Sequence, residues 1–113
     1  MTEPVVESER RTESGLEAVL SFPPESDFFD GHFEGAPVLP GVVQTGTAVR
    51  ALGRMLGRPV RVREVKKLKF AKVVHPGERV SLSLSRRGAG EWAFSYSADG
   101  AMCASGVLVV EDS

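Results

Sequence analysis

The segment 37–49 contains no charged residue, and this restricts what the chain can fold into. A helix is expected over Gly41–Leu56, because Pro40 favours a helix start and Gly57 and Pro59 favour its end. A helix on the surface of a protein has a polar face. The first two turns of this helix should therefore be buried on nearly all sides, and the rest of the chain must wrap around it. The residues expected to mark its apolar face are Val42, Val49, Leu52 and Leu56.

The remaining segments predict strands. Residues 16–22 predict a short strand that two prolines end, and residues 60–74 predict a longer one with imperfect alternation. Residues 80–85 alternate apolar side chains with serine, and residues 92–96 alternate aromatic side chains with small ones. The inward positions expected in these strands are Val62, Val65, Leu68, Phe70, Val80, Leu82, Leu84, Trp92, Phe94 and Tyr96.

Turns separate these segments and set an order of elements. Turns are expected at 75–78 and 88–90, and Asp99-Gly100 is a strong hairpin signal before a last strand over 101–110. The order is a strand, the buried helix, and four antiparallel strands connected as a meander. The prediction is one α+β domain over 15–113, an antiparallel sheet wrapped around a central helix. Residues 1–14 are expected to form a flexible arm or a loosely paired edge.

A histidine in the loop before the helix suits chemistry on a thioester. His32 has an unperturbed pKa near working pH, and the glycines at 31 and 35 let the backbone hold it in a loop. The backbone N–H of Gly41 lies in the first helical turn, where it has no partner within the helix and lies at the positive end of the helix dipole. A base and an oxyanion donor could thus face one carbonyl. His75 precedes Pro-Gly and is expected to be an ordinary turn residue.

The block Gly31-His32-Phe33-Glu34-Gly35-Ala36-Pro37-Val38-Leu39-Pro40-Gly41-Val42 resembles the HFxGxPVxPGV signature of the β-hydroxyacyl-acyl-carrier-protein dehydratases. The resemblance implies a hot-dog fold, His32 as the base and Gly41 as the backbone oxyanion donor. It implies conversion of a 3-hydroxyacyl thioester on acyl carrier protein into the trans-2-enoyl thioester, in fatty-acid or polyketide- and polyene-type biosynthesis, with no cofactor. It also implies an edge-to-edge dimer with the active site at the subunit interface. The residues expected to contact substrate are Phe33, Gly35, Pro40, Val42 and Gly46.

Gly46 departs from the pattern of these dehydratases. They have a glutamate or aspartate five residues after the Pro-Gly pair, and glycine cannot donate a proton. The helix neighbours Gln44, Thr45 and Thr47 are poor acids. Three interpretations remain open: His32 or an ordered water protonates the leaving hydroxyl, a second hot-dog subunit supplies the acid in a heterodimer, or the chain binds acyl thioesters without turning them over. The first two together are the favoured hypothesis, with a non-catalytic partner subunit as the alternative and a thioesterase as the third choice.

Charge is distributed unevenly along the chain. Residues 1–34 have a net charge of -7, residues 50–87 of +10, and the whole chain of -1. A basic segment points to an anionic partner or to a solvated surface that balances the acidic N-terminus. The spacing of Arg50, Arg54 and Arg58 predicts a basic ridge that receives an acidic carrier protein or the phosphate of its pantetheine arm.

Composition argues against several other classes. The basic residues alternate with apolar strand positions and aromatic content is 7%, which argues against nucleic-acid binding. Two histidines and one cysteine without metal-ligand spacing argue against a metal site. No apolar run approaches the roughly 20 residues needed to cross a bilayer, and the N-terminus has no signal-peptide pattern. A single cysteine suits a reducing compartment, so a cytoplasmic location is expected.

Overall fold

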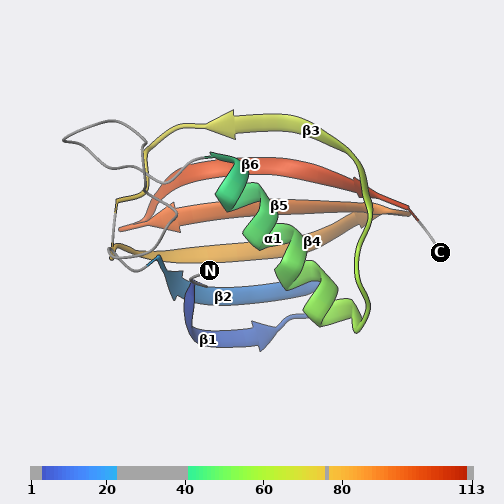
Figure 1. Cartoon of the computed structure of the whole chain (residues 1–113), viewed down its shortest axis with the longest axis horizontal. Helices are drawn as coiled ribbons and strands as arrows, with labels where there is room; N and C mark the ends of the chain where they lie inside the picture. Colours follow the sequence, from blue (N-terminus) through green and yellow to red (C-terminus); the bar gives the residue numbers. More distant parts are fainter. Residues whose placement is uncertain (1–3, 23–40, 76, 112–113) are drawn as a thin grey trace.

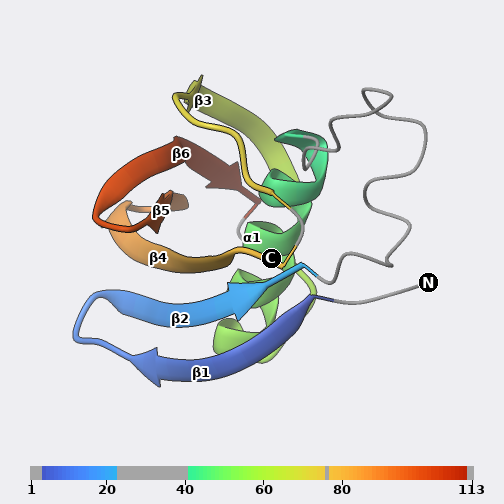
Figure 2. The same cartoon turned by 90° about the vertical axis from the view of Figure 1, so that its left-hand side faces the viewer.

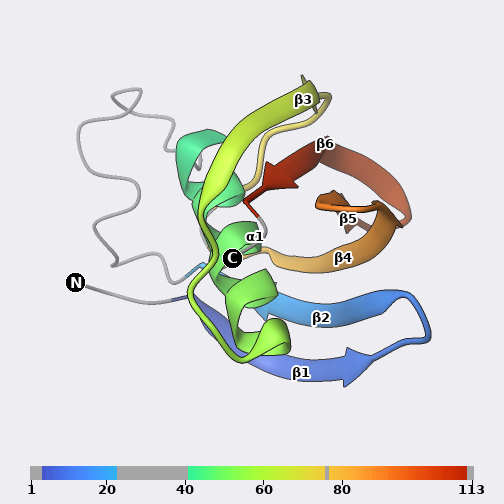
Figure 3. The same cartoon turned by 90° about the vertical axis from the view of Figure 1, so that its right-hand side faces the viewer.

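A computed structural model describes residues 4–22, 41–75 and 77–111 of the chain. One helix lies against a six-stranded sheet, and Figure 1 shows the helix running diagonally across it. The elements are β1 (Val5–Arg11), β2 (Gly15–Ser21), α1 (Gly41–Leu56), β3 (Val62–Phe70), β4 (Arg79–Gly88), β5 (Glu91–Ala98) and β6 (Ala101–Val110). Seen from its two ends, the sheet curves around α1 (Figures 2 and 3). The prediction of an antiparallel sheet around one central helix is confirmed.

The strand order is β1-β2-β4-β5-β6-β3, with antiparallel neighbours throughout. The predicted four-strand meander after the helix is wrong for its first strand. Only β4, β5 and β6 form a meander, while β3 crosses to the far edge and pairs with β6. The reason is that β4 already has β2 on one side and β5 on the other. Apolar alternation indicates which side chains face the core, but not which strands are neighbours.

Alternation in the central strands matches the sheet. The inward side chains of β4 and β5 are buried against α1, and serines occupy the other face of β4. Asp99 and Gly100 have φ values of 51° and 78°, the left-handed pair expected of a two-residue hairpin turn between β5 and β6. Inward residues that are less than a tenth exposed are Leu16, Ala18, Leu20, Val80, Leu82, Leu84, Trp92, Phe94, Tyr96 and Ala98.

The N-terminal segment and the strand after the helix differ from the expected ranges. Part of 1–14 forms β1, an edge strand paired with β2 with one register shift and with every residue exposed, which corresponds to the paired-edge alternative. β3 is shorter than the predicted 60–74, and its pairing with β6 shifts register near Lys67, whose φ is 53°. A bulge adds a residue to one strand of a pair. This bulge explains why apolar residues recur imperfectly in β3.

The predicted boundaries of the helix are confirmed, and its buried face is rotated from the predicted one. No described side chain between 43 and 49 is exposed, as expected for an uncharged segment. The buried side chains, however, are Gln44, Thr47, Ala48, Ala51, Leu52 and Met55. Val49 and Leu56 are only half-buried, because they lie beside that face rather than on it.

The chain after the helix folds back against it at Gly53. A Cβ atom on Gly53 would lie 3.1 Å from the carbonyl oxygen of Arg58, so a glycine permits the close approach. The second half of α1 is therefore covered on one side by the sheet and on part of the other by residues 57–60. No helix in the described part of the chain is long and apolar enough to cross a membrane.

Candidate functional site

The predicted site residues fall into two groups. His32, Phe33, Gly35 and Pro40 lie outside the residues that the structure describes. The others follow one another along one element: Gly41, Val42, Gly46, Arg50 and Arg54 belong to α1, and Arg58 comes two residues after its end. The described part of the predicted site is therefore the central helix and the turn that follows it.

Gly41 is the first residue of α1. Its N–H group has no carbonyl four residues earlier within the helix to which it could donate a hydrogen bond. The partial positive charge of the helix N-terminus adds to the attraction for an oxyanion at this point. Both properties are those required of the predicted oxyanion donor.

Tyr96 anchors the first half of the helix to the sheet. Its hydroxyl on β5 donates a hydrogen bond of 2.8 Å to the backbone carbonyl of Gln44, and its side chain is fully buried. Burial raises the pKa of Tyr96, while the charge of Arg50 and a hydrogen bond with Thr47 lower it by less. The hydroxyl therefore stays protonated and remains a donor. Sequence reasoning treated Tyr96 only as a core residue, although a buried tyrosine hydroxyl usually has a hydrogen-bond partner.

Gly46 lies on the side of α1 that faces away from the buried face. It comes two positions after Gln44, and at 100° per residue this places it roughly on the opposite side of the helix. It is half-buried, and among the described residues beyond its neighbours and the backbone of α1 itself, a Cβ atom added at this glycine would lie within 4 Å only of Nη1 of Arg50, at 3.6 Å. Packing therefore leaves room for a side chain, and the missing carboxylate is not a consequence of crowding by the described residues.

A guanidinium group stands beside the position of the missing acid. Arg50 lies one turn after Gly46, donates a hydrogen bond of 3.4 Å to the hydroxyl of Thr47, and is exposed. A cation at this point favours a nearby anion and disfavours a protonated, neutral carboxyl group. The local electrostatics of this helix turn therefore suit binding of a negative group better than donation of a proton by an acid.

The three arginines of the predicted basic ridge border one groove of about 580 Å³. Its lining is mostly apolar, although the arginines surround it. Arg54 forms an ion pair of 3.0 Å with Glu9 of β1, whereas Arg58 has no ion pair within residues 4–22, 41–75 and 77–111. Arg58 lies in the turn after α1, so the ridge does not continue as one helix face. The residues that line the groove are Val49, Arg50, Gly53, Arg54, Gly57, Arg58, Pro59 and Val60.

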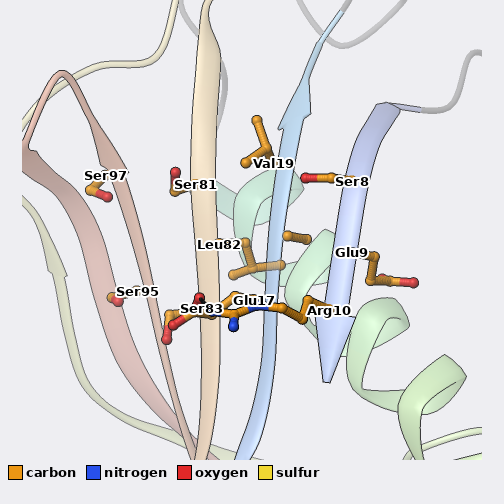
Figure 4. A pocket seen from close by; sticks show the side chains of 11 residues that line it. Ser8, Glu9, Arg10, Glu17, Val19, Ser81, Leu82, Ser83, Ser95 and Ser97 are labelled. Atoms are coloured by element: carbon orange, nitrogen blue, oxygen red, sulfur yellow. Dashed lines mark hydrogen bonds and ion pairs between the residues drawn. The ribbon is translucent and has the colours of Figure 1, made fainter. Parts of the chain in front are cut away.

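A second cavity, of about 520 Å³, lies on the face of the sheet that turns away from α1 (Figure 4). Serines on β4 and β5 point into it, Arg10 and Glu17 form an ion pair of 2.6 Å on its lining, and the lining residue Glu9 is paired with Arg54 of α1. None of the predicted site residues lines it. A serine needs an adjacent base to act as a nucleophile, and the two carboxylates on the lining, Glu9 and Glu17, are already paired with arginines.

His75 and Cys103, the other potentially reactive side chains among the described residues, lie in a turn and in the core. His75 is exposed, and its backbone N–H and carbonyl bond to the carboxylate and the N–H of Glu78, as expected of a turn. Cys103 is buried in the core. Among the described residues no group of three or more histidine, cysteine, aspartate or glutamate side chains could hold a metal ion.

Comparison with protein families identifies the chain. The model of the ApeI-like family, described as ApeI dehydratase, matches residues 8–107. The chain belongs to this family. The match includes the helix, all the strands from β2 to β5 and most of β6, so it spans the fold as well as the signature block.

Curated relatives agree with this assignment, and a solved structure has the same fold. The 3-hydroxyacyl-[acyl-carrier-protein] dehydratase FabZ of Syntrophobacter fumaroxidans is 38% identical over 72 residues, which are 54% of this chain and 49% of that enzyme. FabZ of Latilactobacillus sakei is 41% identical over 64 residues, covering 50% of this chain and 46% of that enzyme. The chain thus spans about half the length of the curated relatives that it matches. The dehydratase heterocomplex ApeI:P from Xenorhabdus doucetiae superposes with a TM-score of 0.89 at 21% identity, over 98% of this chain and 100% of that one. The fold is therefore the hot-dog fold, as the signature predicts.

Proposed function

We propose that this chain acts in the dehydration of a 3-hydroxyacyl thioester on acyl carrier protein to the trans-2-enoyl thioester. The main support is the family match over residues 8–107, which includes an unbroken HFxGxPVxPGV block. The relatives named FabZ catalyse dehydration of such substrates according to their names. The pathway would be fatty-acid biosynthesis or a polyketide- or polyene-type pathway, and no cofactor is required.

In the proposed reaction His32 removes the proton α to the thioester carbonyl. Negative charge then develops on the carbonyl oxygen, and the N–H of Gly41 stabilises it. As the C–O bond at the β carbon breaks, the hydroxyl group takes up a proton and leaves as water, so that atoms and charge balance. Phe33, Gly35, Pro40 and Val42 would shape the surroundings of the acyl group and exclude water.

We infer that a second hot-dog subunit takes part in this reaction. The proton for the leaving hydroxyl has no donor at Gly46, and the nearby Arg50 would keep a carboxyl group ionised. A carboxylic acid from another subunit would supply the proton without any change on this chain. The related fold from Xenorhabdus doucetiae is described as a heterocomplex, and this chain is similar to one of its components.

Arg50, Arg54 and Arg58 are proposed to receive the carrier protein or the phosphate of its pantetheine arm. They surround a groove with a mostly apolar lining, and Arg58 has no ion pair within the described residues. Guanidinium groups bind phosphate in a bidentate manner, and the apolar lining suits the aliphatic part of a pantetheine arm.

Gly46 also favours one alternative, a non-catalytic subunit that binds acyl thioesters or supports an active partner. Without an acid on its helix, the chain could contribute only binding. His32 argues against this alternative, because a chain without chemistry has no need of a base in that loop. A thioesterase is the third candidate, for which Gln44 is the one helix residue able to orient water, but Gln44 is buried and lies on the face of α1 toward the sheet.

Turnover of a short 3-hydroxyacyl thioester on carrier protein tests the proposal, with loss of water followed by mass spectrometry. Activity of the purified chain that His32→Ala lowers on the order of a hundred- to ten-thousand-fold would support catalysis by this chain. His75→Ala is the matched control and should leave activity unchanged, because His75 lies in a surface turn.

If the chain alone is inactive, the same assay is repeated with a hot-dog subunit co-purified with it. Activity of the pair that depends on His32 of this chain supports the heteromeric enzyme. Activity of the pair that survives His32→Ala would instead assign the chain to the non-catalytic class.

A further inference from the structure

Three side chains form a series of hydrogen bonds between the outer surface of α1 and its backbone. Arg50 is exposed and donates a hydrogen bond of 3.4 Å from Nη2 to the hydroxyl of Thr47. Thr47 is hydrogen-bonded to Tyr96, whose hydroxyl donates a bond of 2.8 Å to the carbonyl of Gln44. Thr47, Tyr96 and Gln44 are all buried. The series therefore begins at a cation in contact with solvent and ends at a buried peptide group of the helix.

All the hydrogen bonds of this series have the same direction. Burial raises the pKa of Tyr96, while the charge of Arg50 and the hydrogen bond with Thr47 lower it. A hydrogen bond that lowers this pKa favours the ionised oxygen, so the hydroxyl of Thr47 is the donor. Each hydroxyl thus accepts one hydrogen bond and donates the next. Hydrogen bonds in such a row polarise and strengthen one another, and a charged donor at the start adds to this effect.

The last acceptor belongs to a peptide group that also bonds to the first residue of α1. The carbonyl of Gln44 and the N–H of Thr45 are parts of one planar peptide unit. In an α-helix the N–H of residue 45 donates to the carbonyl of residue 41, and α1 begins at Gly41. One rigid unit is therefore bonded to Tyr96 through its oxygen and to Gly41 through its nitrogen.

The strand that carries Tyr96 is a firm point of attachment for this turn. β5 has a paired strand on each side, and Tyr96 lies opposite Leu82 of β4 and Ala104 of β6. The first turn of a helix, by contrast, has N–H groups without partners in the helix, and helix ends fray. A buried hydrogen bond from a central strand to this turn restricts its movement.

We infer that Tyr96 is a positioning residue for the proposed oxyanion donor: it fixes the first turn of α1 and thereby the direction of the N–H of Gly41. Thr47 supports this role by orienting the hydroxyl of Tyr96. The role rests on the proposed function, because it requires a thioester carbonyl at the N-terminus of α1. A donor that is already in place stabilises developing charge without reorganisation, and a small displacement of it lowers the rate.

Tyr96→Phe tests this role because it removes the hydroxyl and keeps the ring. The assay uses the active form of the enzyme, either this chain alone or its complex with a second subunit. The expected fall in kcat is roughly tenfold, smaller than the hundred- to thousand-fold loss that follows removal of a whole oxyanion donor. KM should change little, because the donor acts mainly on the transition state.

Thr47→Val removes the second hydroxyl and keeps the shape of the side chain. It should lower kcat by less than Tyr96→Phe, because the bond from Tyr96 to the helix remains. The double variant should be nearly as active as Tyr96→Phe alone, since both substitutions act through the same series of hydrogen bonds.

An infrared measurement separates positioning from a general loss of stability and requires no turnover. The probe is the butanoyl thioester of pantetheine, isotopically labelled at its carbonyl carbon and without the hydroxyl group that dehydration would remove. A hydrogen bond to a carbonyl oxygen lowers its stretching frequency, so binding to the wild-type protein should lower the frequency of the probe. Tyr96→Phe should return it part of the way to the value of the free probe.

Leu52→Val is the matched control, because Leu52 is buried on the same helix and takes no part in the hydrogen bonds. The substitution removes one buried methylene group and so lowers stability through packing alone. Both kcat and the carbonyl frequency should stay near their wild-type values, although urea denaturation shows that the fold is less stable.

Three results would overturn the inference: a wild-type protein that does not lower the carbonyl frequency, Tyr96→Phe with the wild-type frequency, or Leu52→Val with the same change as Tyr96→Phe. Absence of turnover in the dehydration assay would contradict the proposed function instead. Because the frequencies are measured on a probe that cannot be dehydrated, they still report whether Tyr96 positions the N–H of Gly41, and the two failures are distinguishable.

Discussion

The two halves of α1 differ in the charge of their side chains. Residues 41–49 contain no charge, and Tyr96 ties this half to the sheet through the carbonyl of Gln44. The second half contains Arg50 and Arg54, and its outward face borders a groove. The first half begins at the proposed oxyanion donor, so it is the half in which water should be scarce and geometry fixed. The second half meets solvent, where charges can attract a partner but contribute little to stability.

The largest expected difference in the free energy of unfolding is between a buried and a half-buried leucine of the second half. Leu52 is fully buried, and Leu52→Ala should lower the free energy of unfolding by about 2–5 kcal/mol, because it removes buried surface and leaves a cavity. Urea denaturation of the purified chain measures this. Leu56→Ala, at a half-buried position of the same helix, is the control and should cost clearly less. Equal losses would mean that the face of α1 toward the sheet is not the one described.

The anchor of the first half predicts a dependence of stability on alkaline pH. The pKa of Tyr96 is raised in the folded state, so the folded chain holds its proton while the unfolded chain releases it above a pKa of about 10. Stability from this group is therefore complete well below about pH 10 and is lost progressively as the pH rises through and above that value. The difference between the wild-type chain and Tyr96→Phe, measured by urea denaturation at pH 9, 10 and 11, isolates it.

Tyr96→Phe should also cost about 1 kcal/mol at neutral pH, since one hydrogen bond is lost while the ring remains. A parallel fall of both chains above pH 10 would show that Tyr96 is not the responsible group. Phe94→Leu serves as a control for packing, because Phe94 contacts the ring of Tyr96 edge-on at a centroid distance of 6.2 Å but has no hydroxyl group.

These two halves also differ in how far the sequence predicts them. The uncharged segment 37–49, with Pro40 before the helix and Gly57 after it, is sufficient to place the helix in the sequence. The reason is that helix ends are determined by neighbouring residues. The strict alternation of β4 and β5 is equally local. The position of β3 beside β6 is not predicted, since it depends on which strand edges remain free after the others have paired.

The same distinction holds for the site. The block around His32 and Gly41 is read from consecutive residues, and its resemblance to the dehydratases led to the family. The hydrogen bond from Tyr96 to Gln44 joins residues 52 positions apart, and no pattern in the sequence indicates it. The approach of Arg50 to Gly46 could have been found from the i, i+4 spacing alone, because such residues are neighbours on a helix.

A carboxylate introduced at position 46 tests whether Arg50, at the start of the second half, controls the protonation of an acid in the first half. Gly46→Glu should raise the free energy of unfolding by about 1 kcal/mol, because glycine is a poor helix residue and the introduced carboxylate would pair with Arg50 one turn later. The same pair lowers the pKa of the new carboxyl group, so this variant should gain no dehydratase activity on its own. Gly46→Glu combined with Arg50→Gln removes the cation and should leave more of the acid protonated.

The expected outcome is that the double variant turns over a 3-hydroxyacyl thioester faster than either single variant in the absence of a partner subunit. Gly46→Gln with Arg50→Gln has nearly the same shape without an acid, and is the matched control. If Gly46→Glu alone is as active as the double variant, then Arg50 does not hold the carboxyl group ionised.

Substitutions of the arginines at the groove are expected to have the smallest effects on stability. They should therefore separate an effect on binding from an effect on stability most clearly. Arg54→Gln removes the ion pair with Glu9, and because both side chains are partly exposed the cost should stay below about 1 kcal/mol. Arg58→Gln removes no described ion pair and should cost less still. Together with Arg50→Gln they should weaken binding of an acidic carrier protein several-fold at low salt, with the difference fading as salt screens the charges. Fluorescence anisotropy of a labelled carrier at two salt concentrations measures this. The groove is a binding surface only if the affinity for the carrier falls while the free energy of unfolding is nearly unchanged. Arg86→Gln on β4 is the control for removing a positive charge away from the groove.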